Sequence, residues 1–376
     1  MTRVRLGDVA REVRKRTLES SDLPTVGLEH LDSGEVELTR WNEGVETTFT
    51  KGFEKGQVLF GRRRAYLHKA VVAPFDGVCS GDITVIAAGD GLSPRLLPFI
   101  IQNDALFKHA VEKSAGSLSP RVKWQGLAEF EIELPGIQAQ EGLADVLWAA
   151  QETKRRYKRL LATCDDVVKS QFVEMFEGKE YPSSCLSTLV SSMRNGLSPS
   201  KSGSHRSKVL TLSAITQGHF DSSAWKDGFF TEKPPADKRV SNEDFYVCRG
   251  NGNKHLVGTG EYSNVPMKDM VFPDTMIAAR IKQEQIILPY LRCAWNRPST
   301  RKQIEASAKT TNGTFKINQT ALGNIKLLVP PLELQQEFAD FAASVDKSKF
   351  AVQQALDELN ATTKKILNQE LGLGDV

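Results

Sequence analysis

The sequence Leu-Pro-Gly-Ile-Gln-Ala-Gln-Glu-Gly-Leu-Ala-Asp at residues 134–145 returns in altered form as Val-Pro-Pro-Leu-Glu-Leu-Gln-Gln-Glu-Phe-Ala-Asp at residues 329–340. The two copies are 195 residues apart, which aligns Pro135 with Pro330 and Gln140 with Gln335. This period is too long for a solenoid, whose repeats run to roughly 20–50 residues. The sequence therefore predicts two domain-sized halves, each a globular module followed by a long helix.

Weaker similarity precedes each copy in the same order. The matched segments are 6–10 with 186–190, 57–64 with 244–251, Gly116-Ser117 with Gly313-Thr314, and 127–134 with 322–329. The stretches between these segments have diverged. A conserved skeleton with altered loops suggests two copies of one task performed on two different targets.

Each repeat continues into a segment with the periodicity of a coiled-coil seam. Steps of four and three residues from Leu143 to Met175 give apolar side chains, interrupted only by Lys154 and Gln171. The same steps from Leu334 to Ile366 are interrupted by Ser348 and Thr362. A helix of about 38 residues is roughly 57 Å long, more than one small module can cover. The two seams are therefore expected to pair as antiparallel helices, the alternative being that each helix faces only its own core.

The modules are predicted to mix helices and strands. Short β-branched runs bounded by Gly, Pro, Asp or Asn indicate strands near 57–60, 70–73, 83–87, 130–134, 276–279 and 325–329. Residues 94–111 and 286–304 are expected to be helical. The predicted fold class is α+β, with modules at 1–137 and 179–332 and long helices at 138–178 and 333–372.

Composition indicates a soluble globular chain. It has 376 residues, 40% of them hydrophobic and 25% charged, and a net charge of +3, so any charged partner must be recognised by local clusters. No signal-like segment or run of roughly 18 apolar residues is present, and a cytoplasmic protein without a membrane partner is expected. The five scattered cysteines and six histidines lack metal-ligand spacing, so no disulfide, metal or cofactor is expected.

Basic residues gather in the predicted loops, at matching places in the two halves. Arg and Lys neutralise phosphates or bond to guanine, Asn suits adenine, and hydroxyl groups contact the backbone. An isolated basic cluster is usually just a solvated surface, but recurrence in both halves favours binding. The candidate DNA-binding residues are Arg62, Arg63, Arg64, Tyr66, His68, Lys69, Ser117, Arg121 and Lys123 in the first half, and Lys201, His205, Arg206, Arg249, Asn251, Asn253, Lys254, Thr314 and Lys316 in the second.

Catalytic signatures are absent from the sequence. It contains no Gly-x-x-x-x-Gly-Lys-[Ser/Thr] phosphate loop, no Gly-x-Ser-x-Gly elbow and no His-Glu-x-x-His. The Asn-Pro-Pro-Tyr or Asp-Pro-Pro-Tyr of amino-methyltransferases is also missing, and no Glu-x-Lys or Asp-x-Lys follows Pro273-Asp274 within the next 35 residues. No catalytic residue is therefore nominated, and the sequence indicates a binding protein.

Two diverged modules, each closed by a Pro-Pro-Leu-x-x-Gln-like helix start, resemble the DNA-specificity subunit of type I restriction-modification systems. The resemblance covers essentially the whole chain, although Gly136 replaces the second proline in the first copy. It implies that each module is a target-recognition domain that reads one half of a bipartite sequence in double-stranded DNA. It also implies that the helices fix the spacer and dock methylation subunits, and that restriction subunits join the complex.

Two other functions remain open on the sequence alone. One is a non-catalytic coiled-coil scaffold whose modules bind protein partners, and the other is an enzyme with an unrecognised active site. The salt dependence of duplex binding distinguishes a DNA-binding protein from a scaffold. Contacts with several phosphates make the logarithm of the binding constant fall steeply with the logarithm of the salt concentration.

Overall fold

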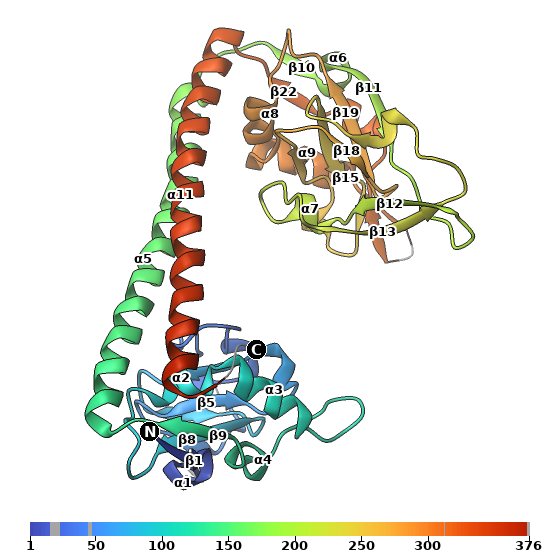
Figure 1. Ribbon diagram of the computed structural model, residues 1–376. Coiled ribbons are helices and arrows are strands. Elements are labelled where there is room, and N and C mark those ends of the chain that lie inside the picture. The colour runs from blue at the N-terminus through green and yellow to red at the C-terminus, as the bar shows by residue number, and fades with distance from the viewer. Residues whose placement is uncertain (16–22, 44–46, 312, 374–376) are drawn as a thin grey trace. The chain divides into compact units, whose positions relative to one another are not determined.

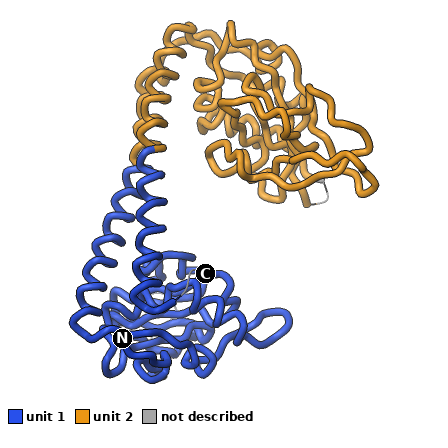
Figure 2. Tube along the Cα trace, in the orientation of Figure 1, with its two compact units in different colours: residues 1–161, 351–376 blue, residues 162–350 orange. Residues whose placement is uncertain are grey.

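The structure is a computed structural model of residues 1–376, and it describes all of them except 16–22, 44–46, 312 and 374–376 (Figure 1). The chain forms two compact units (Figure 2). Unit 1 comprises residues 1–161 and 351–376, and unit 2 comprises residues 162–350. Two long helices, α5 (Ile137–Phe176) and α11 (Leu332–Glu370), each contribute one end to each unit. Both predicted long helices are therefore confirmed.

Unit 1 contains a four-stranded antiparallel sheet in the order β2-β8-β5-β6, a three-stranded sheet β3-β7-β4 and the pair β1-β9. Its strands are β1 (Thr2–Arg5), β2 (Ala10–Val13), β3 (Thr25–Val26), β4 (Lys51–Phe53), β5 (Val58–Gly61), β6 (Ala70–Val72), β7 (Gly77–Cys79), β8 (Ile83–Ala88) and β9 (Glu131–Leu134). Its shorter helices are α1 (Leu6–Val9), α2 (Leu97–Ile101), α3 (Asp104–Glu112), α4 (Trp124–Ala128) and the 3-10 helices η1 (Leu28–His30) and η2 (Ala65–Leu67).

The four-stranded sheet of unit 1 separates two hydrophobic clusters. Along β5, Val58 and Phe60 belong to the cluster that includes the helices, whereas Leu59 belongs to the cluster shared with the three-stranded sheet. Successive side chains of a strand point to opposite faces, so β5 is buried on both sides. This explains the uninterrupted apolar run from which the strand was predicted.

Unit 2 repeats this topology: β11-β19-β15-β17 matches the four-stranded sheet, β10-β22 matches the pair, and β12-β18-β14 matches β3-β7-β4 in order and strand direction. It adds the edge strand β13 beside β12 and the separate sheet β16-β21-β20. Its strands are β10 (Ser183–Cys185), β11 (Val190–Asn195), β12 (His205–Leu210), β13 (Trp225–Phe230), β14 (Arg239–Val240), β15 (Asp244–Cys248), β16 (Gly250–Asn251), β17 (Gly260–Tyr262), β18 (Met267–Val271), β19 (Met276–Ile281), β20 (Lys309–Thr311), β21 (Thr314–Lys316) and β22 (Lys326–Leu328). Its shorter helices are α6 (Leu186–Leu189), α7 (Ser213–Thr216), α8 (Leu288–Trp295), α9 (Pro298–Ser307), α10 (Gln319–Gly323), η3 (Ala236–Lys238) and η4 (Lys254–Leu256).

The segments expected to be helical, 94–111 and 286–304, each contain two helices. In the first, Asn103 is extended (φ −67°, ψ 136°) and its side chain accepts a hydrogen bond from the amide of Ala105, which starts α3 as a separate helix. In the second, Arg297 is extended because Pro298 follows it and disfavours helical geometry at the preceding residue. Both segments are therefore helical as predicted, and a local feature of the sequence interrupts each of them.

Each unit combines the start of one long helix with the end of the other. In unit 1, Leu143 and Leu147 of α5 share a cluster with Leu367 of α11 and with Leu371. In unit 2, the ring of Phe338 at the start of α11 lies 5.4 Å from Phe172 of α5, centroid to centroid. Within each unit the two helix segments therefore contribute to one core, and neither is covered by its own module alone.

Among the described residues, no helix is both long enough and apolar enough to span a membrane. All five cysteines are free.

Candidate nucleic-acid interface

The two predicted basic segments of unit 1 lie against each other. Arg63, which follows β5, forms an isolated antiparallel bridge with Arg121, at the end of the loop between α3 and α4. The amide of Arg64 donates to the carbonyl of Pro120 at 2.8 Å. We call Arg62, Arg63, Arg64, Arg121 and Lys123 the unit 1 basic cluster. Its members come from segments more than fifty residues apart in the sequence.

Asp82 organises the unit 1 basic cluster. Its carboxylate accepts hydrogen bonds from Nε of Arg121 at 2.7 Å and from Nη2 of the same side chain at 3.2 Å. Nη1 of Arg63 lies 3.7 Å away, and Nη2 of Arg63 donates to Oγ of Ser119. The hydrogen bond from Arg121 holds the pKa of Asp82 below its usual range, against the opposing effect of burial. Asp82 therefore stays ionised, fixes the plane of the Arg121 guanidinium and attracts that of Arg63.

The same cluster retains hydrogen-bonding capacity. Nε of Arg62 and Nε of Arg63 are buried and have no hydrogen-bond partner among the described residues. Arg64 and Lys123 are exposed, and no ion pair is formed by either side chain within the described part of the chain. Because Arg64 and Lys123 are exposed, an anion with several acceptor oxygens would suit this surface.

The loop between Arg64 and Lys69 is held in an unusual conformation. Arg64 and His68, which flank η2, have φ values of 56° and 51°, a region that costs energy for residues other than glycine. His68 stacks on Phe107 at 4.4 Å, and Lys69 donates through Nζ to the carbonyl of Leu28 at 2.7 Å. His68 and Lys69 thus have structural partners, whereas the side chain of Tyr66 is 52% exposed.

Unit 2 pairs its corresponding segments as regular strands. β16 lies beside β21, with Gly250 opposite Lys316 and Asn251 opposite Phe315. Lys309 of β20 also lies opposite Lys316. Like charges directly opposite each other destabilise a strand pair, so this hairpin also presents a surface suited to an anion. We call Arg249, Asn251, Lys254, Lys309 and Lys316 the unit 2 hairpin cluster.

The two asparagines of the unit 2 loop already use their carbonyl groups. Oδ1 of Asn251 accepts from the amide of Asn253 at 2.9 Å, and Oδ1 of Asn253 accepts from the amide of His255 at 3.0 Å. Each side chain keeps its amino group as a donor. Arg249 donates through Nη1 to the carbonyl of Asp274 at 3.2 Å, which orients its guanidinium.

A third candidate surface is the exposed face of β12 and β13. Arg206 makes two hydrogen bonds of 2.9 Å with the carboxylate of Asp227. Nζ of Lys208 lies 4.6 Å from the ring centroid of Trp225. Arg206 is opposite Phe229 in the strand register, and Trp225 and Phe229 are 38% and 46% exposed. Lys201 and His205 are exposed nearby in the sequence. This face combines cations with aromatic rings.

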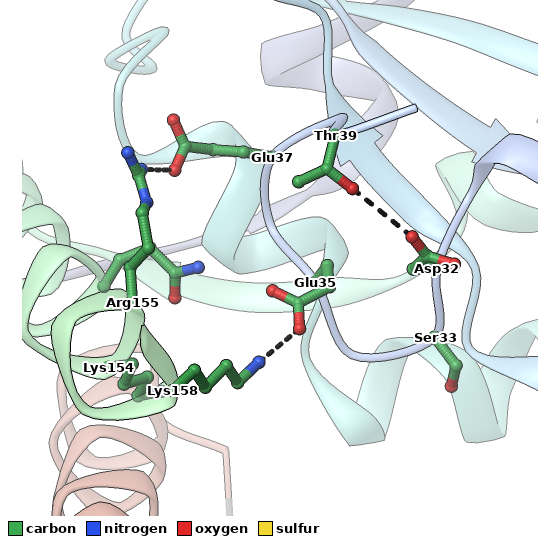
Figure 3. A pocket seen from close by; sticks show the side chains of 9 residues that line it. Asp32, Ser33, Glu35, Glu37, Thr39, Lys154, Arg155 and Lys158 are labelled. Carbon is green, nitrogen blue, oxygen red and sulfur yellow. Dashed lines mark hydrogen bonds and ion pairs between the residues drawn. The ribbon is translucent and has the colours of Figure 1, made fainter. Parts of the chain in front are cut away.

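A pocket of about 290 Å³ in unit 1 lies between the loop of residues 32–39 and helix α5 (Figure 3). Arg155 pairs with Glu37 and Lys158 pairs with Glu35, so acidic loop and basic helix are fastened together. Lys154, which interrupts the apolar seam, also lines this pocket, and burial lowers its pKa. The charges of the pocket are largely satisfied internally, so its function is to attach α5 to the module.

Solved structures match this architecture over the whole chain. The crystal structure of the type I restriction-modification S subunit from M. genitalium aligns with a TM-score of 0.58 at 14% identity, covering 100% of this chain and 96% of that one. The chain has the fold of a type I S subunit. A second solved chain, from a study of complex assembly and conformational transition of the type I R-M system, gives a TM-score of 0.55 at 19% identity, covering 100% and 98%.

The curated relatives found by sequence comparison are also type I specificity subunits. The StySPI specificity subunit of Salmonella potsdam, a type I restriction enzyme component, is 31% identical over 134 residues, which is 34% of this chain and 28% of that protein. The EcoDI specificity subunit of Escherichia coli is 23% identical over 131 residues, 34% of this chain and 29% of that protein. The matched segment thus spans less than a third of either curated relative. No family model matches the chain. The predicted resemblance to specificity subunits is confirmed.

Within this S-subunit fold, the structure assembles most candidate residues into three surfaces. The unit 1 basic cluster gathers the candidates Arg62 to Arg64, Arg121 and Lys123, with the exposed Ser117 on the loop that it anchors. The unit 2 hairpin cluster joins the segment that begins at Arg249 to the segment of Thr314 and Lys316. Arg206 belongs to the third surface, whereas Lys201 precedes β12 and His205 points to the other face of that strand. Contact of any of these residues with DNA stays a prediction.

Sequence reasoning missed several residues of these surfaces. Asp82 was overlooked because it lies far from the basic segments in sequence and its function depends on a long-range pair. Lys309 was missed because its strand was not foreseen. Trp225 and Phe229 alternate along a strand with charged residues, and that alternation could have identified an exposed aromatic face.

Proposed function

We propose that this chain is the DNA-specificity subunit of a type I restriction-modification complex. It binds double-stranded DNA without catalysing a reaction, requires no cofactor or metal, and acts in the cytoplasm. Unit 1 and unit 2 each supply a target-recognition domain that reads one half of a bipartite sequence. Methylation subunits dock on the long helices, and restriction subunits complete the endonuclease.

The observation that carries this proposal is the equivalent pairing of basic segments in both units. Arg63 pairs with Arg121 in unit 1, and Gly250 pairs with Lys316 in unit 2. In unit 1 a residue just after β5 meets the segment that follows α3. In unit 2 a residue just after β15 meets the segment that follows α9. Two related surfaces with different side chains suit two half-sites of different sequence, and the S-subunit fold supports the same reading.

The lengths of the helices support a fixed spacer between the half-sites. With 40 and 39 residues, α5 and α11 are each roughly 60 Å long at 1.5 Å per residue. DNA turns once in about 34–36 Å, so the proposed antiparallel coiled coil would separate the half-sites by more than one turn. Spacer length would then follow from helix length and not from contacts with the spacer bases.

Methylation mapping tests the proposal directly. The intact system, expressed in a host without other methylation systems, is expected to methylate a split motif with a spacer of constant length. A continuous motif, or no methylation that depends on this chain, would contradict the proposal. A salt titration of duplex binding by the assembled complex should also give a steep log-log slope, whereas a protein-binding scaffold should give a slope near zero.

A further inference from the structure

The loop between α3 and α4 carries an apolar side chain at its tip, and the base of this loop belongs to the unit 1 basic cluster. Leu118 is 91% exposed, the most exposed large hydrophobic side chain in the described part of the chain. Its neighbours Ser117 and Ser119 are polar, and the loop projects from the body of unit 1 (Figure 1). Such exposure has no benefit for folding, because the side chain buries almost no area.

The base of this loop is rigid. The amide and carbonyl of Ala115 exchange hydrogen bonds of 3.0 Å with those of Arg121, which closes the loop, and Gly116 turns the chain with a φ of 113°. On the Pro120 side of the loop, the amide of Arg64 donates to the carbonyl of Pro120, and Nη2 of Arg63 donates to Oγ of Ser119. Because the residues on both sides of the tip are held by hydrogen bonds, the loop is preorganised, which lowers the entropic cost of binding.

Charge identifies the partner. Around the loop, Arg62, Arg63, Arg64, Arg121 and Lys123 outnumber the carboxylates of Asp82 and Glu112, and Asp82 is already paired with Arg121. A protein partner seeking an apolar tip would have to be strongly acidic, whereas a DNA duplex offers phosphates on both sides of a stack of apolar base faces. Proteins that bend DNA insert Leu, Ile, Met or Phe between base pairs in this way.

We propose that Leu118 is a wedge that enters the duplex at one base step and partly unstacks it while the unit 1 basic cluster holds the flanking phosphates. The inference rests on the proposed function and adds a distortion step confined to the half-site read by unit 1. In the repeat that matches Gly116-Ser117 with Gly313-Thr314, the counterpart of Leu118 is Phe315, which is partly buried against the core of unit 2 and not exposed at a loop tip. Unit 2 therefore provides an internal comparison within the same molecule.

2-Aminopurine fluorescence tests the wedge, because this base is quenched when stacked and brightens when unstacked. The assembled methylation complex is added to duplexes of the mapped target that carry 2-aminopurine at successive positions in either half. Methyltransferases flip their target base out of the stack, so the target base of each half is left unsubstituted in these duplexes. At the remaining positions we expect a several-fold increase at one position, in one half only. Leu118→Ala should abolish that increase while leaving affinity within about tenfold of the wild type, and Leu118→Met should retain it.

Val265→Ala serves as a matched control, since Val265 is an exposed apolar residue of unit 2 at 55%, and it should change nothing. An unchanged increase in Leu118→Ala, or increases lost from both halves, would overturn the wedge. Binding by the wild type without any fluorescence increase would also overturn the wedge. If, in that case, replacing one thymine by uracil weakens binding, Leu118 contacts a thymine methyl group in the groove and does not enter the stack. Failure of the wild-type complex to bind any duplex would instead contradict the proposed function itself.

Discussion

Gln140 and Gln335 make the same three hydrogen bonds at the starts of the two long helices. Nε2 of Gln140 donates to the carbonyls of Gly91 and Pro135, and its Oε1 accepts from the amide of Ser93. Nε2 of Gln335 donates to the carbonyls of Gln285 and Pro330, and its Oε1 accepts from the amide of Ile287. Each side chain is almost fully buried. The repeated motif thus encodes a clamp that fixes where each long helix leaves its module.

Removing either clamp should destabilise its own unit. Gln140→Ala and Gln335→Ala would each leave buried backbone groups without partners, at a cost of about 1–3 kcal/mol. Urea unfolding of the complex, followed by hydrogen exchange at residues 91–93 and 285–287, would measure the loss. Gln336→Ala is the matched control, because Gln336 is exposed and bonds only to Asp340 of its own helix. An equal decrease in the free energy of unfolding for Gln336→Ala would contradict the role of Gln140 and Gln335 as clamps.

The C-terminal end of α11 should stabilise unit 1 although it follows unit 2 in the sequence. Leu367 and Leu371 are 7% and 0% exposed in the unit 1 core. Asn368, between them, accepts a hydrogen bond from Asn103 at 2.8 Å. Each Leu→Ala substitution should lower the free energy of unfolding by about 2–5 kcal/mol.

Hydrogen exchange would locate the effect of those leucine substitutions. Faster exchange is expected in β9, because the amide of Glu133 donates to the carbonyl of Leu371, while β15 in unit 2 should be unchanged. Gln369→Ala, at an exposed position of the same turn, is the control. Faster exchange confined to unit 2 would show that the helix end does not belong to unit 1.

The exposed cations of unit 1 should contribute electrostatic affinity for DNA. Arg64→Ala and Lys123→Ala are each expected to weaken duplex binding and to reduce the salt slope by about 1, as for the loss of one phosphate contact. Lys347→Ala, an exposed substitution on α11, should leave affinity and slope unchanged. Equal slopes for all four proteins would rule out phosphate contacts by Arg64 and Lys123.

Asp82 should make the stability of unit 1 depend on pH under acidic conditions. Its pKa is lowered in the folded state by the hydrogen bond from Arg121, so its stabilising contribution is complete above the unfolded pKa of about 3.9 and is lost as the pH falls through the folded pKa. The stability advantage of the wild type over Asp82→Asn should therefore be constant near neutral pH and shrink below about pH 4. Unfolding in urea across this range measures it, and an advantage independent of pH would exclude the ion pair as its cause.

Much of this architecture could be predicted from the sequence because it depends on local periodicity and on repetition. The seam from Leu143 to Met175 and the proline-to-glutamine motif identified both long helices and their starts. The sequence did not predict that Leu367 and Leu371 complete the core of unit 1, because that pairing joins the end of the chain to its beginning. The expected antiparallel pairing brings the end of the second long helix toward the first module, but it does not single out these two leucines, which follow the last residue of the traced seam, Ile366.

The candidate site was predictable in composition but not in arrangement. Residue type was sufficient to select Arg63 and Arg121, whereas their pairing and the central carboxylate of Asp82 depend on how two distant loops meet. The sheet β12-β18-β14 corresponds to β3-β7-β4 of unit 1, but the edge strand β13, which carries both aromatic residues, has no counterpart in that sheet. Repeat matching therefore could not identify the aromatic face of Trp225 and Phe229.

The most direct test of the central claim is an exchange of reading loops followed by methylation mapping. Residues 62–69 and 113–123 of unit 1 would be replaced by the corresponding loops of a specificity subunit with a different known target, and methylated motifs would be mapped in a host that carries the methylation subunits. The expected motif is changed in one half, while the other half and the spacer length stay as they were. A change in both halves, or in neither, would contradict the proposed function.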